Sequence, residues 1–281
     1  MEVIREIAPL RGRIKEIKGE NMSIGFVPTM GFLHEGHLSL MRKAREENDY
    51  LVISIFVNPL QFGVGEDYDE YPRDLERDKE LAASVGCDLI FSPPVKEMYP
   101  RGYSTFVEVE RLTERLCGAS RPGHFRGVTT VVTKLFNLIS PDRAYFGQKD
   151  AQQAIIIQKM IQDLNMDLEL VILPTVREED GLAMSSRNKY LTPYQREQAL
   201  LIYKALQKAQ ENIEVGEKNT ERIRELIREI ILQGEEAVID YIEIVDTYEF
   251  QPLSILQGSC LIAVAVKLGE VRLIDNIMVE V

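Results

Sequence analysis

Two of the chain's three histidines, His34 and His37, lie in residues 27–37, a segment that also contains Gly31 and Gly36. Side chains three residues apart share one side of a helical turn, and glycine lets the backbone approach a ligand closely. The N–H groups at a helix start lack partners within the helix and carry partial positive charge. We therefore interpret this segment as a phosphate site with two imidazoles facing it.

A His-x-x-His spacing can also bind a metal ion. The chain contains no His-Glu-x-x-His zinc pattern, and no cysteine or third histidine nearby completes a tetrahedral set. Acidic residues such as Asp78 and Asp150 are insufficient to define a metal site. We favour the phosphate interpretation and assign no metal ligand.

Two polar residues, Asn58 and Gln61, follow the apolar run 51–57. Open α/β sheets bind ligands just beyond the carboxyl ends of their strands, so both residues are candidates for a substrate site. Asn58, which precedes a proline, could instead serve only to end the strand.

A second strand-to-helix turn contains Lys149, which can place a compact charge on a phosphate. Gln153, on the first turn of the helix that follows, can face the same crevice. Asp150 could equally be a helix N-cap.

Two further segments are rich in hydrogen-bond donors. Residues 117–127 contain a cluster that is explained either by ligand binding or by loop packing alone, namely Arg121, His124 and Arg126. Residues 177–188 form a polar loop that could close over a ligand, with hydroxyls and a guanidinium suited to phosphate oxygens at Ser185, Ser186 and Arg187.

Alternating strands and helices must position these segments. Apolar runs predict strands at residues 23–27, 51–57, 88–91, 104–109, 143–146 and 168–173. Helical periodicity and capping residues predict helices at 37–47, 72–84, 128–139 and 151–162. Continuous apolar runs such as 51–57 are typical of a parallel sheet buried on both faces. We therefore predict an α/β domain over residues 1–176.

The rest of the chain, residues 177–281, has a different pattern. Helices are predicted from 192 to about 211 and from about 220 to 233, followed by strands at 240–245, 259–266 and 271–274. The turn at 268–270 suits an antiparallel hairpin. This pattern predicts a smaller α+β domain with an antiparallel sheet.

The composition excludes several functional classes. A net charge of −12 and a pI near 4.9 argue against a nucleic-acid or anionic-membrane surface, since both need clustered positive charge. No apolar run is long enough to span a bilayer. Three scattered cysteines without metal spacing suit a reducing compartment, so we expect a cytoplasmic protein.

Five of the segments described above also resemble a known family. Residues 28–37 look like the His-x-Gly-His signature of nucleotidyl-transferring enzymes, and Met184-Ser-Ser-Arg187 resembles the flexible Lys-Met-Ser-Lys-Ser type loop of that superfamily. Together with residues 58–63, 124–128 and 146–153, they resemble the pantothenate synthetase family. The resemblance extends from the N-terminus to the last strand.

The resemblance implies a Rossmann-like domain that binds ATP and pantoate, a smaller C-terminal lid and a homodimer. It implies that D-pantoate, ATP and β-alanine give pantothenate, AMP and pyrophosphate, with Mg²⁺ on the nucleotide. Matching positions imply ATP contacts at Met30, Gly31, His34, His37, Gly147, Gln148, Lys149, Asp150, Val176, Met184, Ser185, Ser186 and Arg187.

The same resemblance implies that Gln61 and Gln153 bind pantoate, that Gln61 also contacts β-alanine, and that His37 is a proton donor. Gln148 departs from the family pattern, which often has an acidic residue there, so its side chain is not expected to be what binds.

The residue types agree with this chemistry. A carboxylate is already ionised at pH 7, so its attack on the α-phosphorus of ATP needs positioning rather than a strong base. Negative charge then grows on the phosphoryl oxygens. We expect the stabilising donors to be His34, His37, Lys149, Ser186 and Arg187.

Two other functions remain open from the sequence. A nucleotidyltransferase with a phosphorylated acceptor would need extra cations in the acceptor pocket, whereas Gln61 and Gln153 are neutral amides. A non-enzymatic nucleotide-sensing module would not need the set of Lys149, Ser186 and Arg187.

Overall fold

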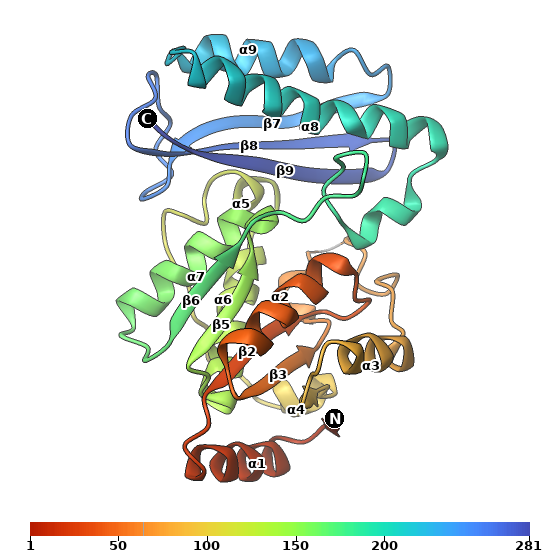
Figure 1. The fold of residues 1–281 in the computed structure, drawn as a ribbon, viewed down its shortest axis with the longest axis vertical. Helices are drawn as coiled ribbons and strands as arrows, with labels where there is room; N and C mark the ends of the chain where they lie inside the picture. Colours follow the sequence, from red (N-terminus) through yellow and green to blue (C-terminus); the bar gives the residue numbers. More distant parts are fainter. Residues whose placement is uncertain (64) are drawn as a thin grey trace. The chain divides into compact units, whose positions relative to one another are not determined.

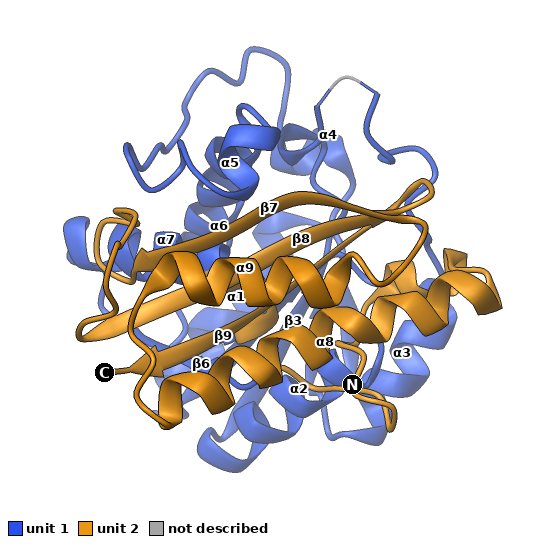
Figure 2. Ribbon diagram, turned by 90° about the horizontal axis from the view of Figure 1, so that it is seen from above, with its two compact units in different colours: residues 1–147, 152–174 blue, residues 148–151, 175–281 orange. Residues whose placement is uncertain are grey.

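The computed structural model describes residues 1–63 and 65–281, which divide into two compact units. Unit 1 comprises Met1–Gly147 and Gln152–Pro174, and unit 2 comprises Gln148–Ala151 and Thr175–Val281. Figure 2 distinguishes them by colour. The main division falls at Pro174, two residues before the domain boundary that we placed after residue 176, and the short turn carrying Lys149 is grouped with unit 2.

Unit 1 contains a six-stranded parallel sheet in the order β1-β4-β3-β2-β5-β6. Its strands are β1 (Glu2–Ile4), β2 (Ile24–Thr29), β3 (Tyr50–Ile55), β4 (Leu89–Phe91), β5 (Arg143–Gly147) and β6 (Glu169–Leu173). The α-helices of this part of the chain are α1 (Ile7–Gly19), α2 (Glu35–Glu47), α3 (Leu75–Ser84), α4 (Val95–Met98), α5 (Cys117–Ser120), α6 (His124–Ile139) and α7 (Ala151–Asp163).

Helices pack on both faces of this sheet. On one face, α2 and α3 cover buried residues of the central strands, including Val27, Leu51 and Ile53. On the other face, the ring of Phe26 packs edge-on against Phe136 of α6, with centroids 6.3 Å apart. The predicted α/β domain, with a parallel sheet buried on both faces, is confirmed.

Unit 2 contains a three-stranded antiparallel sheet in the order β7-β8-β9, from β7 (Ala237–Asp246), β8 (Ser259–Leu268) and β9 (Val271–Glu280). Helices α8 (Pro193–Glu214) and α9 (Thr220–Ile231) lie side by side over one face of it and share one apolar core with it (Figure 1). The tight β8–β9 turn contains Gly269 at φ +57°, a conformation that favours glycine. The predicted small α+β unit with an antiparallel sheet is confirmed.

One predicted strand is wrong. Residues 104–109 form no strand, although they alternate in polarity. Their backbone bonds to side chains of α6 instead: the N–H of Val107 donates to Oγ1 of Thr130 at 3.0 Å, and Oγ1 of Thr129 donates to the carbonyl of Val107 at 2.6 Å. The sequence analysis also did not predict β1 or α1.

Candidate active site

The glycine-containing turn between β2 and α2 places both histidines at the start of α2. Gly31 and Phe32 take positive φ angles of 85° and 51°, and His34 is the N-cap residue. The two imidazole rings lie 4.0 Å apart, centroid to centroid. The backbone N–H of His34 donates to Nδ1 of His37 at 3.3 Å. The predicted strand–turn–helix arrangement around the histidine pair is present.

A buried carboxylate accepts hydrogen bonds from the backbone of this turn. Asp78 of α3 is 1% exposed, and its two oxygens accept from the N–H groups of Phe32 and Leu33, both at 2.7 Å. Burial raises the pKa of Asp78, while the bonds from Leu33 and Phe32 act in the opposite direction. The turn has no room for a larger residue at Gly31, because a Cβ there would lie 2.9 Å from Oδ2 of Asp78.

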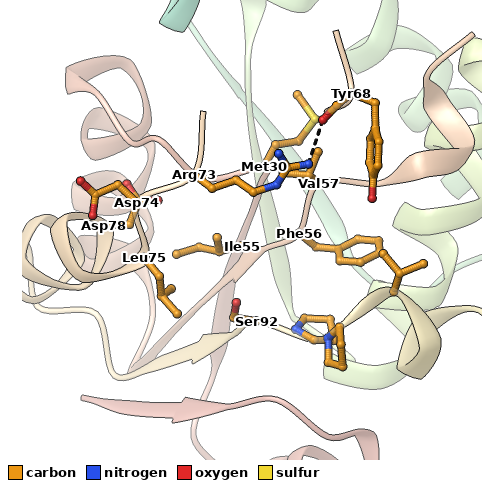
Figure 3. Close-up of a pocket in the computed structure, with 14 residues that line it drawn as sticks. Met30, Ile55, Phe56, Val57, Tyr68, Arg73, Asp74, Leu75, Asp78 and Ser92 are labelled. Atoms are coloured by element: carbon orange, nitrogen blue, oxygen red, sulfur yellow. Dashed lines mark hydrogen bonds between the residues drawn. The ribbon is translucent and has the colours of Figure 1, made fainter. Parts of the chain in front are cut away.

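A cavity of about 240 Å³ lies beside the turn, at the carboxyl ends of β2, β3 and β4. Figure 3 shows Met30, Ile55 and Phe56 among the residues that line it. The guanidinium of Arg73, which also lines it, donates to three backbone carbonyls, those of Tyr68, Asp69 and Tyr71. The cavity is bordered by the predicted site at Met30 and Gly31, and both polar and apolar side chains line it.

Gln61 is held in one amide orientation by its neighbours. Asn58, which is 1% exposed, donates from Nδ2 to Oε1 of Gln61 at 3.1 Å, and the hydroxyl of Tyr99 donates to Oδ1 of Asn58 at 2.8 Å. Burial raises the pKa of Tyr99, which keeps this donor protonated. The Nε2 group of Gln61 points to the sulfur of Met30, 3.1 Å away. Asn58 thus does more than end a strand.

The carbonyl group of Gln61 is bound by Arg121 and His124, two residues of the cluster whose role the sequence left open. Nδ1 of His124 lies 2.7 Å from the carbonyl oxygen of Gln61, and Nη2 of Arg121 donates to the same oxygen at 3.3 Å. Arg121 also pairs with Glu66 and holds the pKa of that carboxyl below its usual range. Arg126 lies apart from this group, with its guanidinium 4.0 Å from the ring centre of Phe106.

Gly147 ends β5, and Gln153 lies in the first turn of α7, half-buried. The neighbouring Gln152 has a structural role: it accepts from the N–H of Cys117 and donates to the carbonyls of Leu112 and Arg115. In unit 1, the side chain of Gln61 therefore contacts Met30, which directly precedes Gly31 of the histidine turn.

In unit 2, the turn Gln148–Asp150 is a short 3₁₀ segment that leads into α7. Its carbonyl groups are held by Asn276 of β9, which is 4% exposed: Nδ2 donates to the carbonyl oxygens of Gln148 at 2.9 Å and of Lys149 at 3.0 Å. Nε2 of Gln148 lies 3.4 Å from Oδ1 of Asn276. This side chain therefore faces β9.

The predicted closing loop is a small hairpin followed by a capped turn. The N–H of Met184 donates to the carbonyl of Val176 at 3.0 Å, so these two residues face each other. Ser185 then caps the 3₁₀ segment Ser186–Tyr190, because its Oγ accepts from the N–H of Arg187 at 3.2 Å. Val176 and Met184 to Arg187 thus form one continuous structure within unit 2.

The sequence analysis missed the residues that hold these segments. They are Glu66, Tyr99, Asp275 and Asn276, together with Asp78 in its structural role. Polar residues within an apolar β9 pattern were the only signal in the sequence for Asp275 and Asn276.

Two features are absent from the part of the chain that the structure describes. Within residues 1–63 and 65–281, no helix is long and apolar enough to cross a membrane. Over the same residues, no group of three or more His, Cys, Asp or Glu side chains is arranged to hold a metal ion.

Comparison with known proteins gives one consistent result. The model of the pantoate-beta-alanine ligase family matches residues 2–278. The chain is 59% identical to the pantothenate synthetase of Heliobacterium modesticaldum over 281 residues, which covers all of both proteins. It is also 59% identical to the enzyme of the same name from Pelotomaculum thermopropionicum over 276 residues, which covers 98% of each.

Solved structures agree with the sequence comparison. The crystal structure of pantothenate synthetase from Thermus thermophilus matches with a TM-score of 0.93 at 48% identity, covering 99% of each chain. Pantoate-beta-alanine ligase from Francisella tularensis, complexed with beta-gamma ATP and beta-alanine, matches with a TM-score of 0.81 at 36% identity, covering 99% of this chain and 97% of that one. The chain is a ligase and belongs to the pantoate-beta-alanine ligase family.

Proposed function

We propose that this protein condenses D-pantoate with β-alanine at the expense of ATP, through a pantoyl-adenylate intermediate. The observation that carries the proposal is the histidine turn beside an oriented Gln61, within a chain that matches its family from end to end. The turn suits phosphates, and the amide Nε2 of Gln61 is a neutral donor suited to a carboxylate or hydroxyl.

In the first step, a carboxylate oxygen of pantoate attacks the α-phosphorus of ATP, and pyrophosphate leaves with the electron pair of the broken P–O bond. Donors from His34, His37, Lys149, Ser186 and Arg187 stabilise the charge that grows on the phosphoryl oxygens. Gln61 and Gln153 orient pantoate. The other residues proposed to contact the nucleotide are Met30, Gly31, Gly147, Gln148, Asp150, Val176, Met184 and Ser185.

In the second step, the neutral amine of β-alanine attacks the acyl carbon while Gln61 holds the substrate. The C–O bond to AMP breaks, AMP leaves, and the new amide nitrogen loses a proton. An acyl adenylate hydrolyses readily, so residues 184–187 serve to exclude water. In this proposal residues 1–176 bind ATP and pantoate, and residues 177–281 act as the lid.

Mg²⁺ would be bound mainly by the nucleotide. This ion usually keeps several waters and is held by substrate phosphates together with few protein ligands. When bound, Mg²⁺ would neutralise phosphate charge.

We also propose that the enzyme is a cytoplasmic homodimer. Its three cysteines are all buried free thiols, a state that suits a reducing compartment. Sedimentation equilibrium at several concentrations tests the dimer, and a monomer at all concentrations would contradict it.

The first test is exchange of labelled pyrophosphate into ATP with Mg²⁺ and without β-alanine. Exchange that requires D-pantoate, and not other hydroxy acids, supports a reversible pantoyl-adenylate step. Turnover with a phosphorylated acceptor and no exchange with D-pantoate would instead identify a nucleotidyltransferase. Tight ATP binding without any acid-dependent turnover would identify a nucleotide-sensing module.

A further inference from the structure

Two adjacent residues of β9, Asp275 and Asn276, hold two segments of the proposed ATP site. β9 is an edge strand of the three-stranded sheet (Figure 1). Both side chains are 4% exposed, and burying such polar groups is costly unless they are fully hydrogen-bonded. Because successive side chains of a strand point to opposite faces, neighbouring residues can hold one segment on each face.

Asn276 holds the Lys149 turn through the main chain. Its amide donates to the carbonyls of Gln148 and Lys149, two acceptors that only a residue with two N–H groups can satisfy together. An aspartate of nearly the same shape would place oxygens against these carbonyl oxygens. The position therefore requires an amide, rather than any small polar residue.

Asp275 holds the hairpin that carries Val176 and Met184. Its carboxylate pairs with the guanidinium of Arg177 through two bonds, of 2.6 and 3.0 Å. Arg177 also donates to the carbonyl of Gly181 across the hairpin at 3.2 Å. The two anchors are tied to each other, since Oδ1 of Asp275 accepts from the N–H of Asn276 at 2.8 Å.

We propose that Asp275 and Asn276 are positioning residues: they hold the turn Gln148–Asp150 and the segment 176–187 in the positions that ATP binding needs. This inference rests on the proposed function, which assigns ATP contacts to Lys149 and Arg187. Neither Asp275 nor Asn276 needs to touch the nucleotide. Both residues belong to one strand and bind the segments that carry the ATP-binding side chains. They therefore fix the positions of those side chains.

The test is Asn276→Asp in the full-length enzyme, with Thr220→Val as a matched control. Thr220 is 2% exposed in unit 2, and its hydroxyl likewise donates to a main-chain carbonyl, that of Leu253 at 2.6 Å. We expect Asn276→Asp to lower kcat/KM for ATP by about a hundredfold, the order associated with a displacement of about 1 Å. KM for β-alanine should change much less, and Thr220→Val should remain within about twofold.

Hydrogen exchange provides a readout that does not depend on activity. In Asn276→Asp, amides in and just after the turn, residues 148–153, should exchange faster, while amides of α9 keep their protection. Uniformly faster exchange throughout unit 2 would show a merely structural role and overturn the proposal, as would unchanged exchange with normal turnover. Where Asn276→Asp fails to fold, Asn276→Ala is measured in the same way.

A reference variant separates this proposal from the proposed function. Lys149→Ala should abolish most turnover while leaving exchange at β9 unchanged. If Lys149→Ala is fully active, the assignment of Lys149 is wrong. If Lys149→Ala is inactive and Asn276→Asp is normal in both readouts, the proposed function stands and the positioning role fails.

Discussion

Individual residues in this site act mainly by holding other residues. The imidazole of His124 shows this most clearly, because its two nitrogens have different partners. Nδ1 faces the carbonyl of Gln61, which can only accept, and Nε2 faces a guanidinium N–H of Arg121 at 3.1 Å, which can only donate. These two partners suit a ring with its proton on Nδ1 and a lone pair on Nε2.

His124→Asn should retain function better than His124→Ala. The asparagine Nδ2 group can replace the Nδ1 donor to Gln61, whereas alanine leaves that carbonyl with Arg121 alone. We expect His124→Ala to raise KM for pantoate by about tenfold, the value of a lost bond near 1.4 kcal/mol, with a smaller effect on ATP. Steady-state kinetics of both variants measure this.

Two observations check that prediction. Nitrogen-15 NMR should show Nδ1 as the protonated nitrogen in one of three histidine signals, the one absent from His124→Asn. Arg126→Gln is the control from the same helical turn, and its kinetics should match the wild type. Equal kinetics for His124→Ala and the wild type would exclude the positioning role.

Asp78 is expected to matter for turnover more than for stability. Asp78→Asn keeps one acceptor but turns an N–H₂ group toward a backbone N–H of the histidine turn, a mismatch that costs about 1–3 kcal/mol locally. Burial raises the pKa of Asp78, so above its ordinary pKa near 3.8 the ionised side chain lowers the free energy of unfolding. Asparagine carries no charge, and this offsets part of the stability that the mismatch removes. Turnover should fall at least about tenfold through the displaced histidines.

The matched control for Asp78 is Asp246→Asn. Asp246 also accepts from backbone N–H groups of a turn, those of Tyr248, Glu249 and Gln251, but it lies in unit 2 at the end of β7. Its substitution should alter the midpoint of urea unfolding without altering turnover. If both variants reduce turnover equally, Asp78 has no special role at the histidine turn.

Among the elements, the first turn of α6 is the one that positions Gln61. It brings His124 to the Gln61 carbonyl, and one turn later it presents Gly127 directly to the segment Pro59–Gln61. A Cβ at Gly127 would lie 2.2 Å from the carbonyl oxygen of Leu60. Glycine is needed here for close approach of two backbones rather than for an unusual φ angle.

Gly127→Ala should separate these two elements. We expect a loss of about 1–3 kcal/mol in unfolding free energy, typical of overpacking, together with a higher KM for pantoate. Gly12→Ala is the control: it lies inside α1 with no atom within 4 Å of the new Cβ, so it should stabilise the protein by about 0.5–1 kcal/mol. Urea titration measures both, and a stable Gly127→Ala would contradict the packing.

The elements also show what the sequence could and could not predict. Apolar runs ending in glycine or polar residues identified β2, β3 and β5 and the turns that follow them, because that chemistry is local. Residues 104–109 were mistaken for a strand because alternation of polarity does not specify what the backbone bonds to; here the backbone of Val107 bonds to threonine side chains of α6 instead of to a neighbouring strand. Similarly, Gln148 and Asn276 are 128 positions apart, and no local spacing predicts that pairing.

For the molecule as a whole, stability should depend on pH at both ends of the range. The chain has 45 acidic and 33 basic residues, and some carboxylates, such as Glu66 beside Arg121, have lowered pKa values. A lowered pKa contributes stability that is present above the ordinary value near 4.5 and is lost as pH falls through the folded-state value. Glu66→Gln should therefore show less of the acid-induced loss than the wild type.

The alkaline limit is set in part by a buried thiol. Cys87 is 5% exposed, and burial raises its pKa from 9.0 to about 12. A raised pKa contributes stability that is complete below the unfolded value of 9.0 and is lost as pH rises toward 12, because the unfolded thiol ionises first. By about pH 10.5, this linkage should remove about 2 kcal/mol from the unfolding free energy.

Comparison with Cys87→Ala isolates this contribution from the many lysines and tyrosines that titrate over the same range. The variant loses packing at all pH values, since Cys87 lies in the core between the sheet and helices α2 and α3. It does not carry the thiol linkage, so the stability difference between wild type and variant should narrow as pH rises from 9 to 10.5. Urea unfolding under reducing conditions measures this, and a difference that stays constant with pH would mean that the folded thiol ionises as freely as the unfolded one.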